Sequence, residues 1–292
     1  MYNASENRIA SQLQRDIESE LDRIGVLSRV FSRAKSIASL DAKINRSPKK
    51  YSSGGKKIQD LFGIRVAVYF PDDSHIAQKA IRNMFQCDEG SSTIDTPKND
   101  MFSATRCNLV FRLPQEISDQ SAVISSNELV DSTFEVQFRT VLSEGWHEVE
   151  HDLRYKHKED WGPHDDLSRA LNGIYASLET ADWSMMKLFE ELAYRHYKAA
   201  EWSQMIRAKF RLRIRDELSD TVKTILDTEN NIGKKLYRVD RGKFIVRLLE
   251  DRIRLPITLD NILYLCNHYY IKSSLISDIT PDLLKQICSE LE

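Results

Sequence analysis

The chain has 292 residues, of which 42 are lysine or arginine and 44 are aspartate or glutamate, so its net charge is -2. This length suffices for one large domain, or for a catalytic domain and a smaller one, and the balanced charge excludes a global basic field that recruits nucleic acid. No apolar run approaches a membrane span, and the 4 cysteines stand far apart without a C-x-x-C pair, which predicts a cytoplasmic protein with reduced thiols.

The first predicted element is a long helix over residues 5–47, because apolar side chains recur three to four positions apart from Ile9 to Ile24. The second half of this helix is basic. Cations at such spacings on a helix can surround a triphosphate, although a solvated basic face is the better explanation when they are taken alone. These cations are Arg33, Lys35 and Lys43.

A buried strand is predicted over residues 64–70, where apolar residues alternate and Arg65 points to the other face. Asp60 stands just before this strand. Taken alone, it could equally be a capping or turn residue. Further along, the pattern predicts in order a helix, a second strand and a surface connection, over residues 75–85, 105–113 and 114–131.

Residues 133–156 combine a strand with a helix. Apolar residues alternate first with Glu135, Gln137 and Arg139, so these three polar side chains leave the strand on one face. From Leu142 the apolar positions move to helical spacing. A corner that gathers a carboxylate, an amide, a guanidinium and a histidine indicates a site for a charged ligand. The helical residues that we expect near the polar face are Glu150, His151 and Lys156.

The rest of the chain is predicted to be mainly helical. From Leu167 to Leu192 the apolar residues stand alternately four and three apart, and we expect this stripe to pack against the sheet or a partner helix, with core packing favoured. Residues 207–215 alternate basic and apolar residues, which fits either a strand or a continued helix. Residues 201–292 are expected to form a small accessory module that could carry an inhibitor, an activator or a second subunit of a homo-oligomer.

Several motifs coincide with those of one family. The pattern E-x-Q-x-R-T, followed by W, E-H and Y-K, resembles the synthetase domain of the RelA/SpoT family, the alarmone synthetases. Residues 33–43 carry the family's R-x-K-x-x-x-S-[IL]-x-x-K and residues 60–66 its D-[IL]-x-G-I-R-V, and the resemblance covers roughly residues 25–200. The positions that match the first pattern are Glu135, Gln137, Arg139, Thr140, Trp146, Glu150, His151, Tyr155 and Lys156.

The resemblance implies an α/β fold, with a mixed sheet of about five strands flanked by helices in the nucleotidyltransferase-like arrangement. It assigns residues 1–200 to the synthetase domain and residues 201–292 to the helical module. The implied reaction moves the β,γ-pyrophosphate of ATP to the ribose 3′-hydroxyl of GDP or GTP, which gives ppGpp or pppGpp. Such chemistry depends on charge neutralisation and in-line positioning more than on covalent help.

The resemblance also implies roles for individual residues. Asp60 and Glu135 would hold Mg²⁺, which takes one or two carboxylates together with phosphate oxygens, and Glu135 would help to remove the hydroxyl proton. ATP would be held by Arg33, Lys35, Lys43 and Arg65, with the two arginines on either side of the adenine. The acceptor would be held by Phe102, Gln137, Arg139, His151, Tyr155 and Lys156.

The segment expected to bind the acceptor departs from the family pattern. Met101 replaces a glycine, Phe102 a tyrosine, Ala104 a serine and Arg106 a histidine. Phe102 can still stack on a base, but Met101 would adopt a positive φ only at a cost of roughly 1 kcal/mol or more. A toxin-like relative that modifies the CCA end of tRNA, or an adenine nucleotide, is therefore an alternative. A nucleotide sensor without turnover is disfavoured, because both metal carboxylates are present.

A competing motif is H-E-x-x-H at residues 147–151, which is the signature of zinc proteases. We expect it to be coincidental, because no third ligand follows at a familiar spacing and Glu150 and His151 already belong to the RelA/SpoT pattern. We also expect no alarmone hydrolysis, since the residues before Arg33 are too few for the hydrolase domain of long family members.

Overall fold

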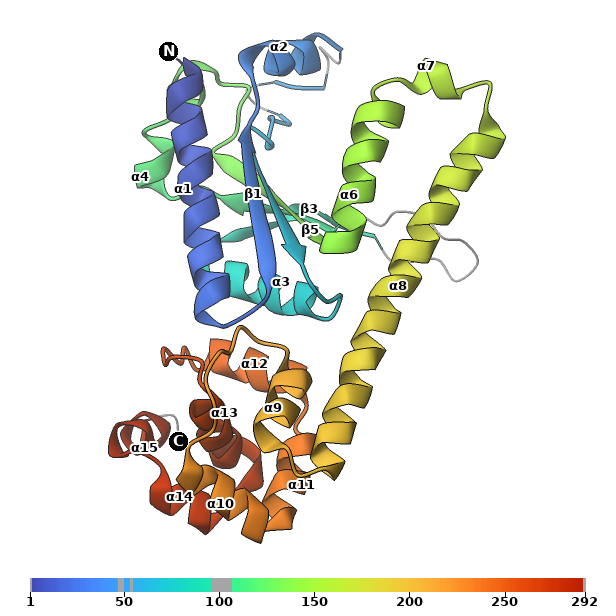
Figure 1. The fold of residues 1–292 in the computed structure, drawn as a ribbon. Helices are drawn as coiled ribbons and strands as arrows, with labels where there is room; N and C mark the ends of the chain where they lie inside the picture. Colours follow the sequence, from blue (N-terminus) through green and yellow to red (C-terminus); the bar gives the residue numbers. More distant parts are fainter. Residues whose placement is uncertain (1, 47–49, 53–54, 96–106, 291–292) are drawn as a thin grey trace. The chain divides into compact units, whose positions relative to one another are not determined.

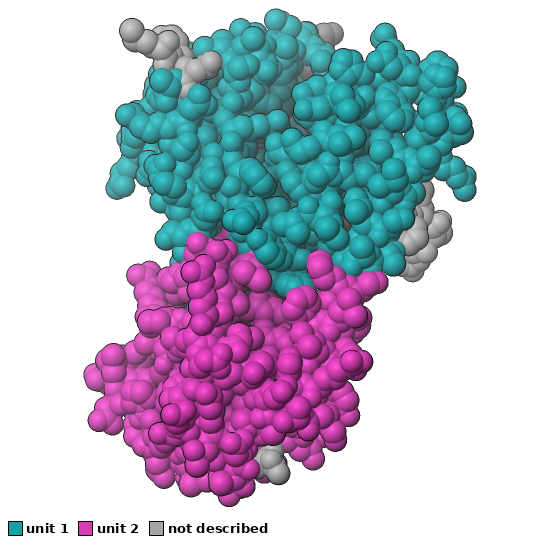
Figure 2. Space-filling model, viewed as in Figure 1, with its two compact units in different colours: residues 1–20, 28–182 teal, residues 21–27, 183–292 magenta. Residues whose placement is uncertain are grey.

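The computed structural model describes residues 2–46, 50–52, 55–95 and 107–290. The chain divides into two compact units, which Figure 2 shows in different colours. Unit 1 contains residues 1–20 and 28–182, and unit 2 contains residues 21–27 and 183–292. The division predicted from the sequence, with a synthetase domain in residues 1–200 and an accessory module in residues 201–292, stays a prediction.

Unit 1 is built on a five-stranded mixed sheet with the order β1-β2-β5-β4-β3 (Figure 1). Strands β2 and β5 run parallel, and every other neighbouring pair is antiparallel. The predicted mixed sheet is therefore confirmed. The strands are β1 Ser28–Ala34, β2 Phe62–Val68, β3 Cys87–Ile94, β4 Cys107–Arg112 and β5 Thr133–Thr140.

Helices cover the apolar face of this sheet. Ile64 and Val136 are fully buried there, and Gln14 of α1 donates a hydrogen bond to the carbonyl of Val30 in β1 over 2.8 Å. Helix α6 follows directly on β5 (Figure 1). The helices of unit 1, some of which extend beyond it, are α1 Tyr2–Arg23, α2 Ile37–Arg46, α3 Asp73–Met84, α4 Gln115–Ser118, α5 Ala122–Ser126, α6 Val141–Val149, a π-helix Glu150–Tyr155, α7 Lys158–Trp161 and α8 Asp165–Lys198.

The predicted helix over residues 5–47 is wrong in its middle part. The chain leaves α1 and passes Gly25, whose φ of +74° suits glycine and ends helical geometry. Beyond it, β1 alternates buried and exposed side chains with a period of two, as Val30 and Phe31 show. Arg33 therefore lies on a strand, whereas Lys43 lies on α2.

The other elements predicted in unit 1 are confirmed where the structure describes them. Strands β2 and β5, helix α3 and the described part of β4 all lie where alternation or helical periodicity places them. The sequence did not predict β3, because its segment CDEGSSTI contains glycine and serines and has no apolar alternation.

The described residues from 201 onward, which belong to unit 2, are mainly helical, as predicted. Residues 207–215, for which the sequence allowed either a strand or a continued helix, form neither throughout. Helix α9 ends at Phe210, and Arg211 takes a left-handed conformation. Leu212 then forms an isolated β-bridge with Val26. The helices are α9 Trp202–Phe210, α10 Asp220–Thr228, α11 Asn230–Arg238, α12 Arg241–Glu250, α13 Leu259–Cys266, a π-helix Asn267–Ile271, α14 Ser274–Ile279 and α15 Asp282–Ser289. No helix in the described part of the chain is long and apolar enough to cross a bilayer.

The prediction that the stripe of α8 packs in the core is wrong, because five of its eight members are exposed and the other three are only half-buried. Leu167, Ile174, Leu188 and Leu192 are 52%, 54%, 69% and 41% exposed. The buried residues of this helix lie on a neighbouring strip instead, and they are Tyr175, Asp182, Met186 and Ala193. The regular spacing therefore indicated an apolar face correctly, but the protein packs α8 through the strip beside it.

Candidate active site

Strand pairing brings several predicted site residues onto one face of the sheet. Gly63 pairs with both Arg33 and Glu135, and Arg65 pairs with Gln137. Because paired residues point to the same side of a sheet, these side chains share the face opposite to the apolar one. The prediction that the polar residues of 133–139 leave one face is thus confirmed.

The side chain of Arg33 lies over the sheet at Gly63. A Cβ added to Gly63 would lie 3.6 Å from Cγ and 3.7 Å from Nε of Arg33. Arg33 is exposed, and among the residues that the structure describes none forms an ion pair or hydrogen bond with its guanidinium. This cation is therefore available to a ligand on the polar face.

Asp60 holds two of the predicted ATP-binding lysines. Nζ of Lys35 and Nζ of Lys43 each lie 2.8 Å from its carboxylate oxygens. Burial raises the pKa of Asp60, but hydrogen bonds and charges of the two lysines outweigh this effect, so the pKa is lowered from its ordinary value. The carboxylate is therefore ionised at neutral pH, with two ammonium groups beside it.

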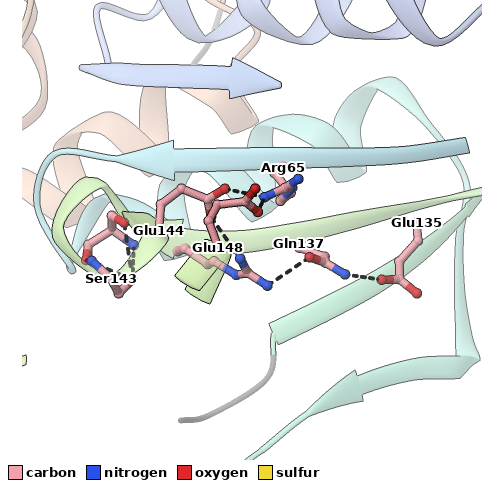
Figure 3. Close-up of polar contacts among 8 residues, drawn as sticks. Arg65, Glu135, Gln137, Ser143, Glu144 and Glu148 are labelled. Carbon is pink, nitrogen blue, oxygen red and sulfur yellow. Dashed lines mark hydrogen bonds and ion pairs between the residues drawn. The ribbon is translucent and has the colours of Figure 1, made fainter. Parts of the chain in front are cut away.

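A hydrogen-bonded row runs along β5 (Figure 3). The amide nitrogen of Gln137 donates to Oε1 of Glu135 over 2.6 Å, and Arg139 donates to Oε1 of Gln137 over 3.1 Å. Asn108 of β4 also donates to Oε1 of Glu135, over 3.1 Å. Two amides thus orient the Glu135 carboxylate, and Gln137 links it to the guanidinium of Arg139.

Two carboxylates of α6 bind the arginines of this face (Figure 3). Glu144 lies 2.6 Å from Nη1 of Arg65 and 2.9 Å from Nη1 of Arg139, and Glu148 also forms an ion pair with Arg65. Burial raises the pKa of Glu144, but both arginines counter it, and the net pKa is lowered. Burial also lowers the pKa of Arg139. Ion pairs therefore connect helix α6 to strands β2 and β5.

The corner between β5 and α6 has a further connection. Thr140 and Ser143 form a reciprocal capping box at the start of α6. The hydroxyl of Thr140 donates to Oδ2 of Asp182 on α8 over 2.6 Å. Asp182 is buried, and burial raises its pKa. Asp182 thus holds the side chain of Thr140, which is the residue directly after Arg139.

Three predicted acceptor residues gather around Asp152 on the π-helix after α6. His151 and Lys156 lie 2.8 Å and 2.6 Å from its carboxylate, and the ring of His151 stacks on that of Tyr155 at 5.9 Å. Gln137 and Arg139 contact Glu135 and Glu144 instead, so the predicted acceptor residues fall into two groups. The sixth one, Phe102, lies outside the described residues.

The histidines of the H-E-x-x-H motif have separate partners. His147 packs edge-on against Trp146 at 5.2 Å and Tyr175 at 5.6 Å. Burial first, and then the charge of Arg139, lowers its pKa to about 4. Glu148 pairs with Arg65 and His151 with Asp152. Over the described ranges, no group of three or more His, Cys, Asp or Glu side chains is arranged to hold a metal.

The donor set fits a magnesium ion. Asp60 is ionised, and both Asp60 and Glu135 offer the hard oxygen ligands that Mg²⁺ prefers beside phosphate oxygens. Asp60 contacts Lys35 and Lys43, while Glu135 contacts Gln137 and Asn108. That the two carboxylates share one ion stays a prediction.

Comparison with known families decides which domain this is. Residues 32–160 match the model described as the region found in RelA/SpoT proteins. The chain contains a RelA/SpoT synthetase domain. The matched segment begins in β1 and ends in α7, so it includes the sheet, the α6 corner and the π-helix. All residues predicted to bind ATP, metal or acceptor belong to the RelA/SpoT segment.

Several solved structures are similar to this chain. Small alarmone synthetase 1 from Bacillus subtilis has 19% identity and a TM-score of 0.47, covering 63% of this chain and 92% of that chain. Its complex with the product pppGpp has 19% identity and a TM-score of 0.49, covering 65% and 95%. A GTP pyrophosphokinase family protein from Streptococcus pneumoniae has 19% identity and a TM-score of 0.44, covering 63% and 89%. Comparison with curated proteins found no match.

Sequence reasoning missed four polar residues of this region. Glu144 and Glu148 stand four apart, a spacing that places two acids on one helix face beside the arginine-bearing strand, and this signal was available. Asn108 and Asp182 gave no such signal, because β4 and α8 meet β5 only in the tertiary structure.

Proposed function

We propose that this protein is an ATP-dependent pyrophosphokinase that transfers the β,γ-pyrophosphate of ATP to the ribose 3′-hydroxyl of GDP or GTP. The RelA/SpoT match over residues 32–160 supports this class of reaction. The observation that carries the proposal is the shared polar face, on which Arg33, Arg65 and Glu135 stand on three adjacent strands.

The arginine positions support adenine binding. Arg33 pairs with Gly63, and Arg65 stands two residues along the same strand, so the two arginines are diagonal neighbours. Diagonal neighbours on antiparallel strands are roughly 7–8 Å apart, which leaves room for a flat base between two guanidinium planes. Stacking of this kind gains from cation–π attraction. Lys35 and Lys43, held together by Asp60, would face the phosphates.

In the proposed transfer, the 3′-oxygen of the acceptor attacks the β-phosphorus of ATP. The bond from that phosphorus to the oxygen bridging to the α-phosphate breaks, and AMP leaves with the electron pair. The hydroxyl proton goes to a base, a role for which Glu135 is the candidate, because two amides orient its carboxylate. Mg²⁺ held by Asp60 and Glu135 would neutralise phosphate charge.

The acceptor side rests on the stacked rings of His151 and Tyr155, with Lys156 beside them. Aromatic rings and a cation suit a phosphorylated nucleotide. The second candidate acceptor is the 3′ end of tRNA or an adenine nucleotide. It is favoured by the departures at Met101 and Arg106 from the family pattern.

The deciding experiment offers ATP labelled on its γ-phosphate together with GDP, GTP, AMP or tRNA. We expect label on GDP or GTP, whereas label on tRNA or AMP alone would establish the second candidate. Glu135→Gln should abolish transfer without unfolding the protein. Glu128→Gln, at an exposed carboxylate outside the site, is the matched control. Binding of ATP without transfer to any acceptor would contradict the proposal and indicate a nucleotide sensor.

A further inference from the structure

Phe31 is a large apolar side chain on the polar face of the sheet. It lies on β1, where Val30 is 4% exposed and Phe31 is 46% exposed, so its ring points away from the core. Its partner in β2 is Arg65, and Arg33 stands two residues along β1 on the same face. Phe31 precedes the matched residues 32–160 and belongs to none of the motifs that carry the RelA/SpoT resemblance. The proposed function therefore gives it no role.

Four positions on β1 and β2 form the corners of a rectangle. Phe31 pairs with Arg65, and Arg33 pairs with Gly63. The two arginines thus occupy one diagonal of the rectangle, and Phe31 and Gly63 occupy the other. Cβ atoms directly opposite each other on antiparallel strands are roughly 4.5–5.5 Å apart, and positions two apart along a strand are separated by roughly 6–7 Å. A flat base held between the two arginines therefore also comes within reach of Phe31.

The surroundings of the two guanidinium groups differ. Arg33 crosses the corner of Gly63, because its Cγ and Nε lie 3.6 Å and 3.7 Å from the place of a Cβ on that glycine. Arg65 forms ion pairs with Glu144 and Glu148 of α6. These carboxylates reach Arg65 from α6, whereas its direct neighbour on β1 is the ring of Phe31. The space between the guanidinium groups is thus bordered on its β1 side by an aromatic ring.

An aromatic ring at this corner suits a purine base. Two guanidinium planes cover the faces of a base but leave its edges open to water. Cation–π attraction is stronger where water is excluded, and a phenyl ring beside a base adds a favourable edge-to-face contact. Strand β1 lies at the edge of the sheet (Figure 1), so no further strand covers this side. Phe31 is placed to shield the base there.

We propose that Phe31 forms the outer wall of the adenine subsite, where its ring packs against the edge of the base that Arg33 and Arg65 hold between them. Phe31 has no hydrogen-bonding side-chain group, so it recognises the apolar surface of the base and takes no part in the transfer of pyrophosphate. This inference rests on the proposed function, because it takes the donor to be ATP.

The first test compares ATP with inorganic tripolyphosphate, which carries three phosphates but no base. Titration calorimetry with the full chain, without an acceptor, measures both dissociation constants. Phe31→Ala should raise the constant for ATP about tenfold, which is at the lower end of the effect of removing an aromatic ring from a base contact. The constant for tripolyphosphate should stay unchanged. Phe31→Trp keeps an aromatic ring and should bind ATP as the parent does.

The matched control is Ile94→Ala. Ile94 is 59% exposed on β3, the strand at the other edge of the sheet. Asn108 shares the polar face with its partner Gln137, so Cys107 beside it and Ile94 opposite Cys107 point to the other face. Shortening this exposed apolar side chain should therefore leave the binding of ATP and of tripolyphosphate unchanged.

The second test detects the contact by fluorescence. ATP should change the emission of Phe31→Trp more than that of the parent, whose 4 tryptophans provide the background, and tripolyphosphate should cause no such excess. Equal ATP affinity of the parent and Phe31→Ala would overturn the proposal and leave the proposed function intact. An equal loss of affinity for ATP and tripolyphosphate in Phe31→Ala would also overturn it, because the base would then not be involved.

Failure of the proposed function gives a different result. A parent that binds ATP with an affinity that depends on Phe31, but transfers no label to GDP or GTP, would support the wall and contradict the reaction. A parent that does not bind ATP would overturn both proposals.

Discussion

The guanidinium of Arg65 binds two carboxylates of α6 that differ in burial. The side chain of Glu144 is 11% exposed and that of Glu148 is 48% exposed. Glu144 also binds Arg139, whereas Glu148 pairs with Arg65 alone among the contacts described. Buried ion pairs are costly to break from one side, while exposed pairs contribute little. The two acids should therefore affect the protein in different ways.

Glu144→Gln should lower the free energy of unfolding by about 3 kcal/mol at pH 7, because it leaves two partly buried guanidinium groups without their carboxylate. Glu148→Gln, the matched comparison, should change it by less than about 1 kcal/mol. The folded pKa of Glu144 lies below its ordinary 4.5, so its contribution is complete above that pH and is lost as the pH falls through the folded pKa. Urea unfolding at several pH values measures the stability of both variants. Equal losses of unfolding free energy in the two variants would contradict the prediction that the more buried carboxylate contributes more.

Glu148→Gln should strengthen ATP binding. In the structure the Glu148 carboxylate is bound to Arg65, so a base that stacks on this guanidinium must compete with it. Removing the charge should lower the dissociation constant for ATP about twofold to fivefold, which is within the range of an exposed ion pair. Titration calorimetry with ATP measures this change. Weaker binding would show that Glu148 orients Arg65 for the nucleotide instead of competing with it.

His147 should stay neutral through the physiological range. Its folded pKa of about 4 lies below the ordinary 6.5, so the unfolded chain takes up a proton first as the pH falls. Stability should therefore be unaffected above about pH 6.5 and should decrease as the pH falls from there towards about 4. NMR of the imidazole should show no charge change between pH 8 and 5.5, and His147→Gln should lack this part of the acid destabilisation. Titration of His147 near its ordinary pKa would refute its burial against Tyr175.

At the scale of elements, the β5–α6 corner depends on a contact with α8. Thr140 caps α6 and donates to Asp182, and it follows Arg139 directly in the chain. Asp182→Ala should lower stability by about 1–3 kcal/mol, because the Thr140 hydroxyl loses its buried acceptor, and it should slow pyrophosphate transfer. Asp182→Asn keeps an oxygen acceptor and should preserve both. Thermal melts and transfer rates test this pair, and equal loss in both variants would mean that the charge matters more than the hydrogen bond.

Another property of the elements is that α6 does not continue as a regular α-helix. It ends at Val149, and a π-helix takes over from Glu150 to Tyr155. A π-turn widens the helix and is frequent at functional sites. Here it carries the ring stack of His151 and Tyr155 and the ion pair of Lys156 with Asp152. The sequence pattern predicted a helix, but the change of helix type decides which side chains gather at this end.

For the molecule as a whole, the two units allow a test of unit 2 by itself. A Cβ on Gly233 of α11 would lie 2.5 Å from the buried ring of Trp202 in α9, so Gly233→Ala should destabilise unit 2 by about 1–3 kcal/mol. We expect faster amide hydrogen exchange in α9 and α11 and unchanged exchange in β2 and β5. Gly173→Ala, where a Cβ meets nothing within 4 Å, is the control and should be neutral or stabilising. Faster exchange in both units would show that they unfold together.

The sequence by itself determined most of the sheet and which polar side chains of β2 and β5 share one of its faces. Alternation of apolar and polar residues in β2 and β5 predicts buried strands with Arg65, Glu135 and Gln137 on the other face, because side chains alternate along every strand. Motif spacing predicted the RelA/SpoT domain. These signals are local, since each depends on residues within a few positions of one another.

Only the tertiary structure decided the rest. Arg33 stands on a strand and not on a helix, because pairing with β2 overrides the weak helical tendency of its neighbours. Glu144 binds the arginines of two strands. Leu167, Ile174 and Leu188 of α8 are exposed, because this helix packs through the adjoining strip, where the ring of Tyr175 lies on that of Trp146. Each of these outcomes depends on segments far apart in the chain, and no local pattern specifies which of their faces meet.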